Sequence, residues 1–186
     1  EGEGPFPAVV LISGSGQQDR DETIFLHKPF KVLADHLTRN GIAVLRYDDR
    51  GVGGSKGSLT NATTLNFADD AESAVTFLMQ RPEIDAGKIG LAGHSEGGLI
   101  APIVASRNPA VAFIVSLAGP GVKGSEIMLR QAKDILAVTG SSQAEIDETL
   151  ANNSYLFRMA VTEPDQRKFA KDAMEWYGKE LDRKGI

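Results

Sequence analysis

The chain of 186 residues contains no cysteine, which excludes disulfides, thiolate metal sites and cysteine nucleophiles. It also has no excess of positive charge, because 20 Lys and Arg residues stand against 25 Asp and Glu residues. The net charge of −5 disfavours nucleic acid and anionic membrane surfaces as partners. No apolar run reaches the ~18 residues that a membrane-spanning helix needs. No cluster of His, Asp and Glu has the spacing of metal ligands, so we expect neither a metal nor a cofactor.

What the chain does contain is a G-x-S-x-G motif at Gly93–Gly97. Residues 88–92 before it have the character of a short buried strand, and residues 98–105 after it that of an apolar helix. A serine on a sharp strand-to-helix turn has its hydroxyl exposed at the edge of the sheet, and glycines allow the tight backbone packing. The motif therefore predicts that Ser95 is a nucleophile. The alternative is an ordinary Gly/Ser turn.

Four continuous apolar runs predict strands that are buried on both faces, as in a parallel sheet covered by helices. The runs are residues 8–12, 42–45, 88–92 and 112–117. Helical patterns alternate with them, the first beginning at Pro29 and stopping near Gly41. This order predicts a three-layer, doubly wound α/β fold, in which ligands bind at the carboxyl ends of the strands.

After Gly121 the pattern becomes wholly helical. A capping box at Ser142–Glu145 begins one predicted helix, and Pro164 is expected to open another. We therefore divide the chain into a partial α/β core, residues 1–121, and a helical lid, residues 122–186. The alternative is a helical tail packed elsewhere on the surface.

The chain resembles the α/β-hydrolase superfamily in three motifs. They are the Gly93–Gly97 elbow, the glycine-rich loop Ser13–Gly16, and Asp48–Ser55, which is similar to the D-x-R-G-x-G-x-S turn of that superfamily. The segment of residues 13–22 also resembles a bacterial esterase group with a G-S-G-x-x-D-R-D loop. The resemblance covers residues 8–121.

This resemblance implies an oxyanion hole formed by the backbone N–H groups of Ser15 and Glu96, with Gly16 as the alternative to Ser15. It implies also that the chain holds strands three to six of an eight-stranded sheet. The two strands that carry the acid and the histidine of a catalytic triad would follow the lid and be absent. A sheet that ends this way exposes an edge, so we expect either self-association as a homo-oligomer or helical parts rearranged over that edge.

Histidine is scarce, and its placement bears on the missing base. The three histidines are His27, His36 and His94, and none follows Ser95, although the superfamily places the histidine after the nucleophile. The side chain of His94 is expected to point away from Ser95, as the residue before the nucleophile does in an elbow. His36 is interpreted as a surface residue of a helix, and His27 as a residue that could line the site.

The remaining charged residues of interest are interpreted mainly as structural. Asp19, Arg20 and Asp21 either orient the oxyanion loop through ion pairs or form a solvated loop. The charged residues at the start of the Asp48–Ser55 turn are expected to hold that turn together. Asp69 and Asp70 are expected in the first turns of a helix, where negative charge is favourable.

These features favour a serine hydrolase, and within that class a carboxylesterase acting on small or medium acyl esters. A thioesterase, an acyltransferase or a peptidase would use the same elbow chemistry. The absence of a histidine after Ser95 supports a different hypothesis, a non-catalytic binding domain with the same fold.

Overall fold

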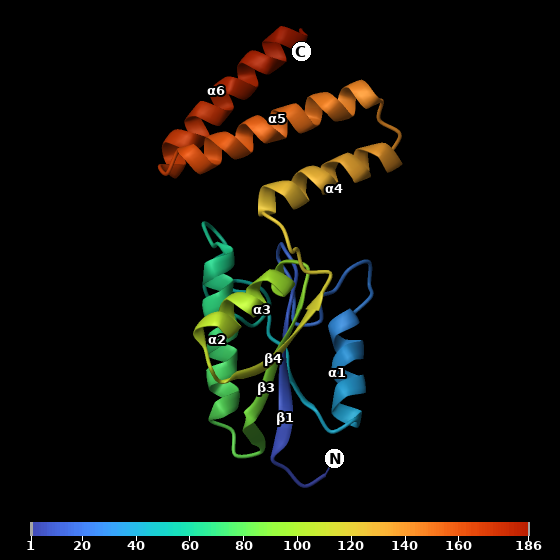
Figure 1. The fold of residues 1–186 in the computed structure, drawn as a ribbon, viewed down its shortest axis with the longest axis vertical. Coiled ribbons are helices and arrows are strands. Elements are labelled where there is room, and N and C mark those ends of the chain that lie inside the picture. The colour runs from blue at the N-terminus through green and yellow to red at the C-terminus, as the bar shows by residue number, and fades with distance from the viewer. Residues whose placement is uncertain (1, 186) are drawn as a thin grey trace. The chain divides into compact units, whose positions relative to one another are not determined.

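The computed structural model describes residues 2–185, and the chain divides into two compact units, residues 1–121 and 122–186. In the first unit a sheet of four parallel strands has the order β2-β1-β3-β4. The strands are β1 (Phe6–Ile12), β2 (Ala43–Leu45), β3 (Ile84–His94) and β4 (Val111–Leu117). Helix α1 (Pro29–Arg39) covers one face, and α2 (Thr64–Met79) and α3 (Glu96–Arg107) cover the other (Figure 1). The predicted three-layer α/β architecture is thus confirmed.

The position of β1 between two layers of helices explains why its sequence is apolar at every position. Val9 and Leu11 pack with Phe30 of α1, whereas Val10 and Ile12 pack with residues of α2 and α3 on the opposite face. All five residues from 8 to 12 are at most 3% exposed. Because successive side chains of a strand point to opposite faces, a strand covered on both faces needs an apolar residue at every position.

Residues 112–117 were predicted to form a buried strand; the strand was predicted correctly and its burial was not. The strand is present as β4, but Phe113, Ile114, Val115 and Leu117 are 36–43% exposed. In the part of the chain that the structure describes, β4 pairs with β3 alone and is an edge of the sheet. The strand has the apolar composition of an interior strand and the position of an edge strand.

We predict that this edge makes the 186-residue chain self-associate. Unpaired backbone groups and apolar side chains on an edge strand favour pairing with the strand of a second chain. Sedimentation velocity across a concentration series would measure it. Val115→Lys should shift the chain toward monomer, since a charge on an edge strand opposes pairing. A wild-type chain that is monomeric at all concentrations would contradict the prediction.

A tight hairpin precedes α1. Ile24 and His27 exchange two backbone hydrogen bonds of 2.9 and 2.8 Å, and the two residues between them are left-handed, with φ of 47° at Phe25 and 67° at Leu26. Both side chains at this tip are 95% exposed. Turns with two left-handed residues ordinarily carry Asn and Gly, because other side chains are strained there. The tip is therefore strained and gains nothing from burial within the first unit.

Replacing Leu26 by glycine is expected to stabilise the first unit by about 1 kcal/mol, because it relieves a left-handed backbone and removes no packing. The exposed α1 position Val32, which is helical, serves as the control: Val32→Gly should destabilise by a similar amount. Urea unfolding of both variants would measure the free energies. A destabilised Leu26→Gly variant would show that the tip has a contact partner.

The second unit consists of α4 (Gly124–Val138), α5 (Gln143–Thr162) and α6 (Gln166–Lys184). The predicted capping box is confirmed, since the Ser142 hydroxyl accepts the Glu145 amide and the Glu145 carboxylate accepts the Ser142 amide. The prediction that Pro164 opens a helix was off by two residues: α6 begins at Gln166 and Asp165 caps it. Tyr155 of α5 stacks on Trp176 of α6 at 4.9 Å between ring centroids. None of the described helices has the length and hydropathy of a membrane span.

Candidate active site

Ser95 lies at the junction of β3 and α3, on a backbone that few non-glycine residues adopt. Its φ is 51° and its ψ is −114°. The surroundings hold it there, because its amide donates to the carbonyl of Leu117 and its carbonyl accepts from the amide of Gly98, both at 2.9 Å. Strain of this kind costs about 1–3 kcal/mol and is concentrated at functional sites. The structure thus gives Ser95 the strained strand-to-helix turn that the motif predicts.

Two glycines of the motif are required by packing. A Cβ atom on Gly97 would overlap the carbonyl oxygen of Ile12 and lie 2.7 Å from that of Ser13. A Cβ atom on Gly93 would overlap the carbonyl of Gly97 and lie 2.6 Å from the amide nitrogen of Gly98. The elbow therefore brings α3 against the end of β1 at a distance that only glycine permits.

The glycine-rich loop after β1 lies against the elbow. A Cβ atom on Gly14 would be only 3.2 Å from the Cβ atom of Ser95. The next residue, Ser15, is exposed, and Glu96 begins α3 directly after Ser95. Within residues 2–185, the amides of Ser15 and Glu96 donate no hydrogen bond to another residue. Neither predicted oxyanion donor is therefore engaged in an intramolecular hydrogen bond within these residues.

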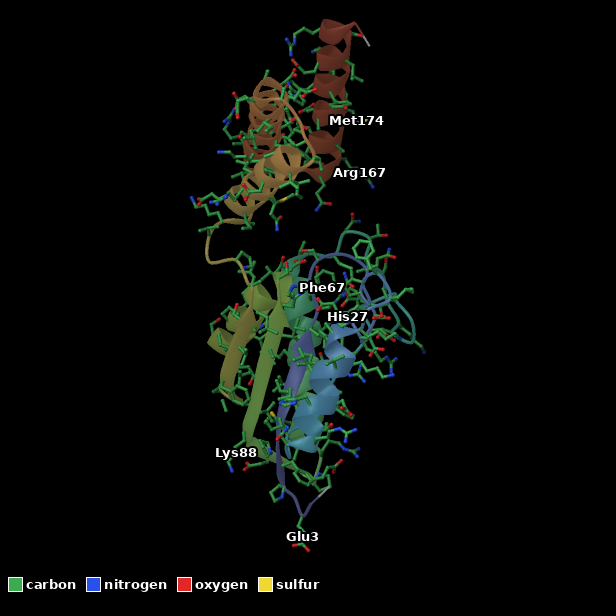
Figure 2. The ribbon with its side chains drawn as sticks, turned by 90° about the vertical axis from the view of Figure 1, so that its right-hand side faces the viewer. Glu3, His27, Phe67, Lys88, Arg167 and Met174 are labelled. Carbon is green, nitrogen blue, oxygen red and sulfur yellow. The ribbon has the colours of Figure 1, made fainter. Side chains whose placement is uncertain are left out.

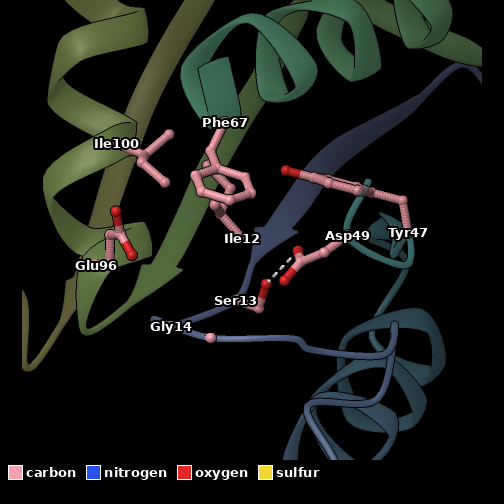
Figure 3. Close-up of a pocket in the computed structure, with 9 residues that line it drawn as sticks. Ile12, Ser13, Gly14, Tyr47, Asp49, Phe67, Glu96 and Ile100 are labelled. Carbon is pink, nitrogen blue, oxygen red and sulfur yellow. Dashed lines mark hydrogen bonds between the residues drawn. The ribbon is translucent and has the colours of Figure 1, made fainter. Parts of the chain in front are cut away.

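Two buried aspartates of the turn after β2 hold the loop of residues 13–23 in place. Asp48 accepts from the backbone amide, Nε and Nη2 of Arg20 at 2.6–3.0 Å, and from the amide of Gly54 at 2.9 Å. Asp49 accepts from the Ser13 hydroxyl at 2.9 Å (Figure 3). It also accepts from the Gln18 amide at 3.0 Å. Of the two interpretations of the charged run 19–21, the ion-paired one agrees with these contacts.

The two carboxylates have opposite pKa shifts. Hydrogen bonds from the Arg20 side chain and the Gly54 amide hold the pKa of Asp48 well below its usual range. Burial raises the pKa of Asp49, against the lowering effect of its bonds to Gln18 and Ser13. Asp48 is therefore the member of the pair whose charge stabilises the fold.

We expect Asp48→Asn to lower the free energy of unfolding by about 1–3 kcal/mol near pH 7, through loss of charge-assisted hydrogen bonds. Because the folded-state pKa is depressed, this contribution is present above the unfolded value, about 3.9, and is lost as pH falls through the folded pKa. Urea unfolding at about pH 7 and at about pH 3.5 should show the difference from wild type shrinking at the lower pH. A difference independent of pH would contradict the assignment to charge.

A small cavity of about 10 Å³, the space of roughly one water molecule, lies beside the loop. Its lining includes Ser13, Tyr47, Asp49, Phe67 and Glu96 (Figure 3). Burial raises the pKa of Tyr47, with the charge of Asp49 adding to the effect. The Glu96 carboxylate accepts the Thr64 hydroxyl at 2.7 Å, so its side chain ties α3 to α2.

None of the histidines forms a hydrogen bond with the Ser95 hydroxyl among the described residues. The Nδ1 atom of His94 lies 2.8 Å from a carboxylate oxygen of Glu22. His36 is exposed on α1, and His27 lies in the hairpin before α1 (Figure 2). The sequence did not predict a separate role for Glu22, because none of the residues that flank it in the sequence indicates that it is buried.

Asp69 and Asp70 lie in the second turn of α2, which begins at Thr64, so their placement in the first turns of a helix is confirmed. Their contacts are ion pairs, Asp70 with Arg50 and Asp69 with Arg107, rather than interactions with the start of the helix. The structural role is right, and the helix-terminus explanation for it was wrong.

The parallel sheet, the strained serine between β3 and α3 and the glycine loop beside it define an α/β hydrolase. A family model described as serine aminopeptidase, S33, matches residues 27–180. The chain belongs to this family of α/β hydrolases.

Individual known proteins are also similar to the chain, in sequence or in fold. The chain is 36% identical over 177 residues to Esterase EstD of Thermotoga maritima, covering 95% of this chain and 42% of that protein. The α/β hydrolase GrgF of a Penicillium species superposes with a TM-score of 0.55 at 25% identity, over 72% of this chain and 44% of that one. An esterase of Pyrococcus furiosus gives 0.57 at 23% identity, over 70% and 47%. The chain thus spans less than half the length of each of these proteins.

Proposed function

We propose that the protein is a serine hydrolase that cleaves carboxylic esters of small or medium acyl chains, with Ser95 as its nucleophile. The observation that carries the proposal is the backbone of Ser95, which is strained, fixed by two hydrogen bonds and packed against Gly14. Strain of this kind is kept where function requires it. The likeness to a protein named an esterase supports the choice of substrate class.

In the proposed reaction the Ser95 hydroxyl oxygen attacks the ester carbonyl carbon, and its proton passes to a general base. The carbonyl oxygen becomes an oxyanion, which accepts hydrogen bonds from the Ser15 and Glu96 amides. The C–O bond to the alcohol then breaks, with the base returning the proton to the leaving alcohol. Water, activated by the same base, hydrolyses the acyl-enzyme and frees Ser95.

We propose that the base is a histidine, paired with an acid, in a part of the polypeptide outside these 186 residues. Three observations support this. His94 is hydrogen-bonded to Glu22, and no histidine follows Ser95 in the chain. The named relatives are also more than twice as long as the matched region.

For residues 122–186 we propose the role of a lid that selects the substrate. The segment is a helical unit of its own, inserted directly after β4. An apolar groove of about 420 Å³ between α4 and α5, lined by Leu129, Phe157 and Val161 among others, supports the proposal. Such a groove suits the acyl chain of an ester better than a charged substrate.

Labelling with a fluorophosphonate, followed by intact mass and peptide mapping, tests the nucleophile on the 186-residue chain and on the complete gene product. We expect Ser95 to be labelled in the complete product and far more slowly in the chain, which lacks the base. A complete product that is well folded and unlabelled would favour the non-catalytic binding domain. Comparison of p-nitrophenyl butyrate with amino-acid p-nitroanilides would separate an esterase from a peptidase, the activity that the family description names.

A further inference from the structure

Glu22 is a buried acid between the two segments that surround Ser95. Its side chain is 8% exposed, and its backbone is left-handed, with φ of 52°. One carboxylate oxygen, Oε1, accepts the Gly14 amide at 2.7 Å and lies 2.8 Å from Nδ1 of His94. A single oxygen atom thus joins the glycine loop after β1 to the residue that precedes the nucleophile.

This carboxylate differs from the other acids of its loop. Asp21 pairs with Lys28 and Arg46, and Asp48 pairs with Arg20, whereas within residues 2–185 Glu22 has no Lys or Arg partner. A buried carboxylate without a cation is costly unless hydrogen bonds satisfy it. Here the hydrogen bonds go to the loop and to the elbow, so any displacement of Gly14 or His94 would leave the charge unsatisfied.

The bond to Glu22 also determines which amide can act in catalysis. Because the Gly14 N–H is directed to the carboxylate, it is not available to an oxyanion, and the next free amide in the loop is that of Ser15. Gly14 is also confined, since a Cβ atom there would lie 3.2 Å from Ser95 Cβ and 3.3 Å from Glu22 Oε1. An oxyanion donor acts only when it is held at about 2.7–3.1 Å from the developing charge.

We infer that Glu22 is a positioning residue. Its carboxylate contacts both Gly14 and His94 and so fixes the Ser15 amide beside Ser95. The inference rests on the proposed function, because it assigns Glu22 a task in the oxyanion hole of that reaction. Glu22 itself touches neither the substrate nor the reacting atoms. It acts through the backbone of the loop.

The test measures kcat and KM for p-nitrophenyl butyrate in the complete gene product. Glu22→Ala should lower kcat by roughly 10–100-fold and leave KM within about 3-fold, because a misplaced donor weakens only the transition-state contact. Glu22→Gln, which can still accept the Gly14 amide, should restore kcat to within about 5-fold of wild type. The rate of fluorophosphonate labelling should follow the same order, because phosphonylation develops a charged oxygen at the same place.

Asp85→Ala is the matched control, since Asp85 accepts the amide of Gly87 at 3.0 Å near the start of β3, at the opposite end of that strand from Ser95. It should leave kcat unchanged. If Glu22→Ala fails to fold, His94→Ala tests the inference in its place. The half-exposed imidazole is the second group that the Glu22 carboxylate contacts, and its loss should lower kcat by about 3–10-fold.

The outcomes separate the inference from the proposed function. If the wild-type protein neither hydrolyses esters nor is labelled at Ser95, both fail. If it does both, and Glu22→Ala or His94→Ala keeps the wild-type kcat, the inference alone is overturned. A fall in kcat that Glu22→Gln does not rescue, or that Asp85→Ala reproduces, would likewise overturn it in favour of a purely structural effect.

Discussion

Gly97→Ala is expected to destabilise the first unit by more than about 4 kcal/mol, enough to unfold many domains of this size. The added methyl group would overlap the carbonyl oxygen of Ile12 and crowd that of Ser13, and both belong to backbone at the end of β1. Backbone in a packed sheet cannot rotate away as a flexible side chain can. To admit the methyl group, α3 must separate from the strand that forms the centre of the core.

The control for this prediction is another glycine of the same unit. Gly87 lies in β3, and a Cβ atom there would have its nearest neighbour at 3.4 Å, an ordinary contact with the Asp85 side chain. Gly87→Ala should therefore change the free energy of unfolding by less than about 0.5 kcal/mol. Urea unfolding and soluble yield would measure both variants. A Gly97→Ala protein as stable as wild type would show that the approach of α3 to β1 is looser than the structure describes.

The fold was predictable where local pattern and burial agree. Residues 8–12 are apolar at every position because β1 is covered on both faces, and a continuous apolar run is a direct sign of that environment. Pro29 begins α1 and Ser142 caps α5, as predicted, because both act through contacts within one helical turn. The turn at Gly93 was predictable for the same reason, since a Cβ atom there would overlap Gly97, only four residues away.

The parts that could not be predicted depend on contacts far away in the sequence. The exposure of β4 is set by what pairs with its outer edge, which its own residues do not encode. Glu22 is buried because Gly14 and His94 meet there, and these residues are 80 positions apart. The left-handed Phe25 and Leu26 contradict ordinary turn preferences, so no local rule could have found them.

If Ser95 is the nucleophile, as proposed, Ser95→Ala is expected to lower the rate of ester hydrolysis by the complete gene product by at least about 10⁴-fold, because the variant lacks the oxygen atom that would form the acyl-enzyme. Steady-state hydrolysis of p-nitrophenyl butyrate would measure the loss. Stability should change little, since alanine keeps the same strained backbone. Ser106→Ala is the control: this serine lies exposed on α3 and bonds only the Ile103 carbonyl, so activity should be unchanged. Ester hydrolysis retained by Ser95→Ala would contradict the assignment of the nucleophile.

Ser95→Gly separates the chemical role of the serine from its cost to the fold. Glycine adopts the φ of 51° and ψ of −114° without a steric penalty, so this variant should be inactive and yet more stable than wild type by about 1 kcal/mol. A side chain that lowers stability at its own position is expected to have another role, and the proposed role of the Ser95 hydroxyl as nucleophile would be such a role. If Ser95→Gly were inactive but no more stable than wild type, the Ser95 backbone would be unstrained, and strain would no longer support the proposed function.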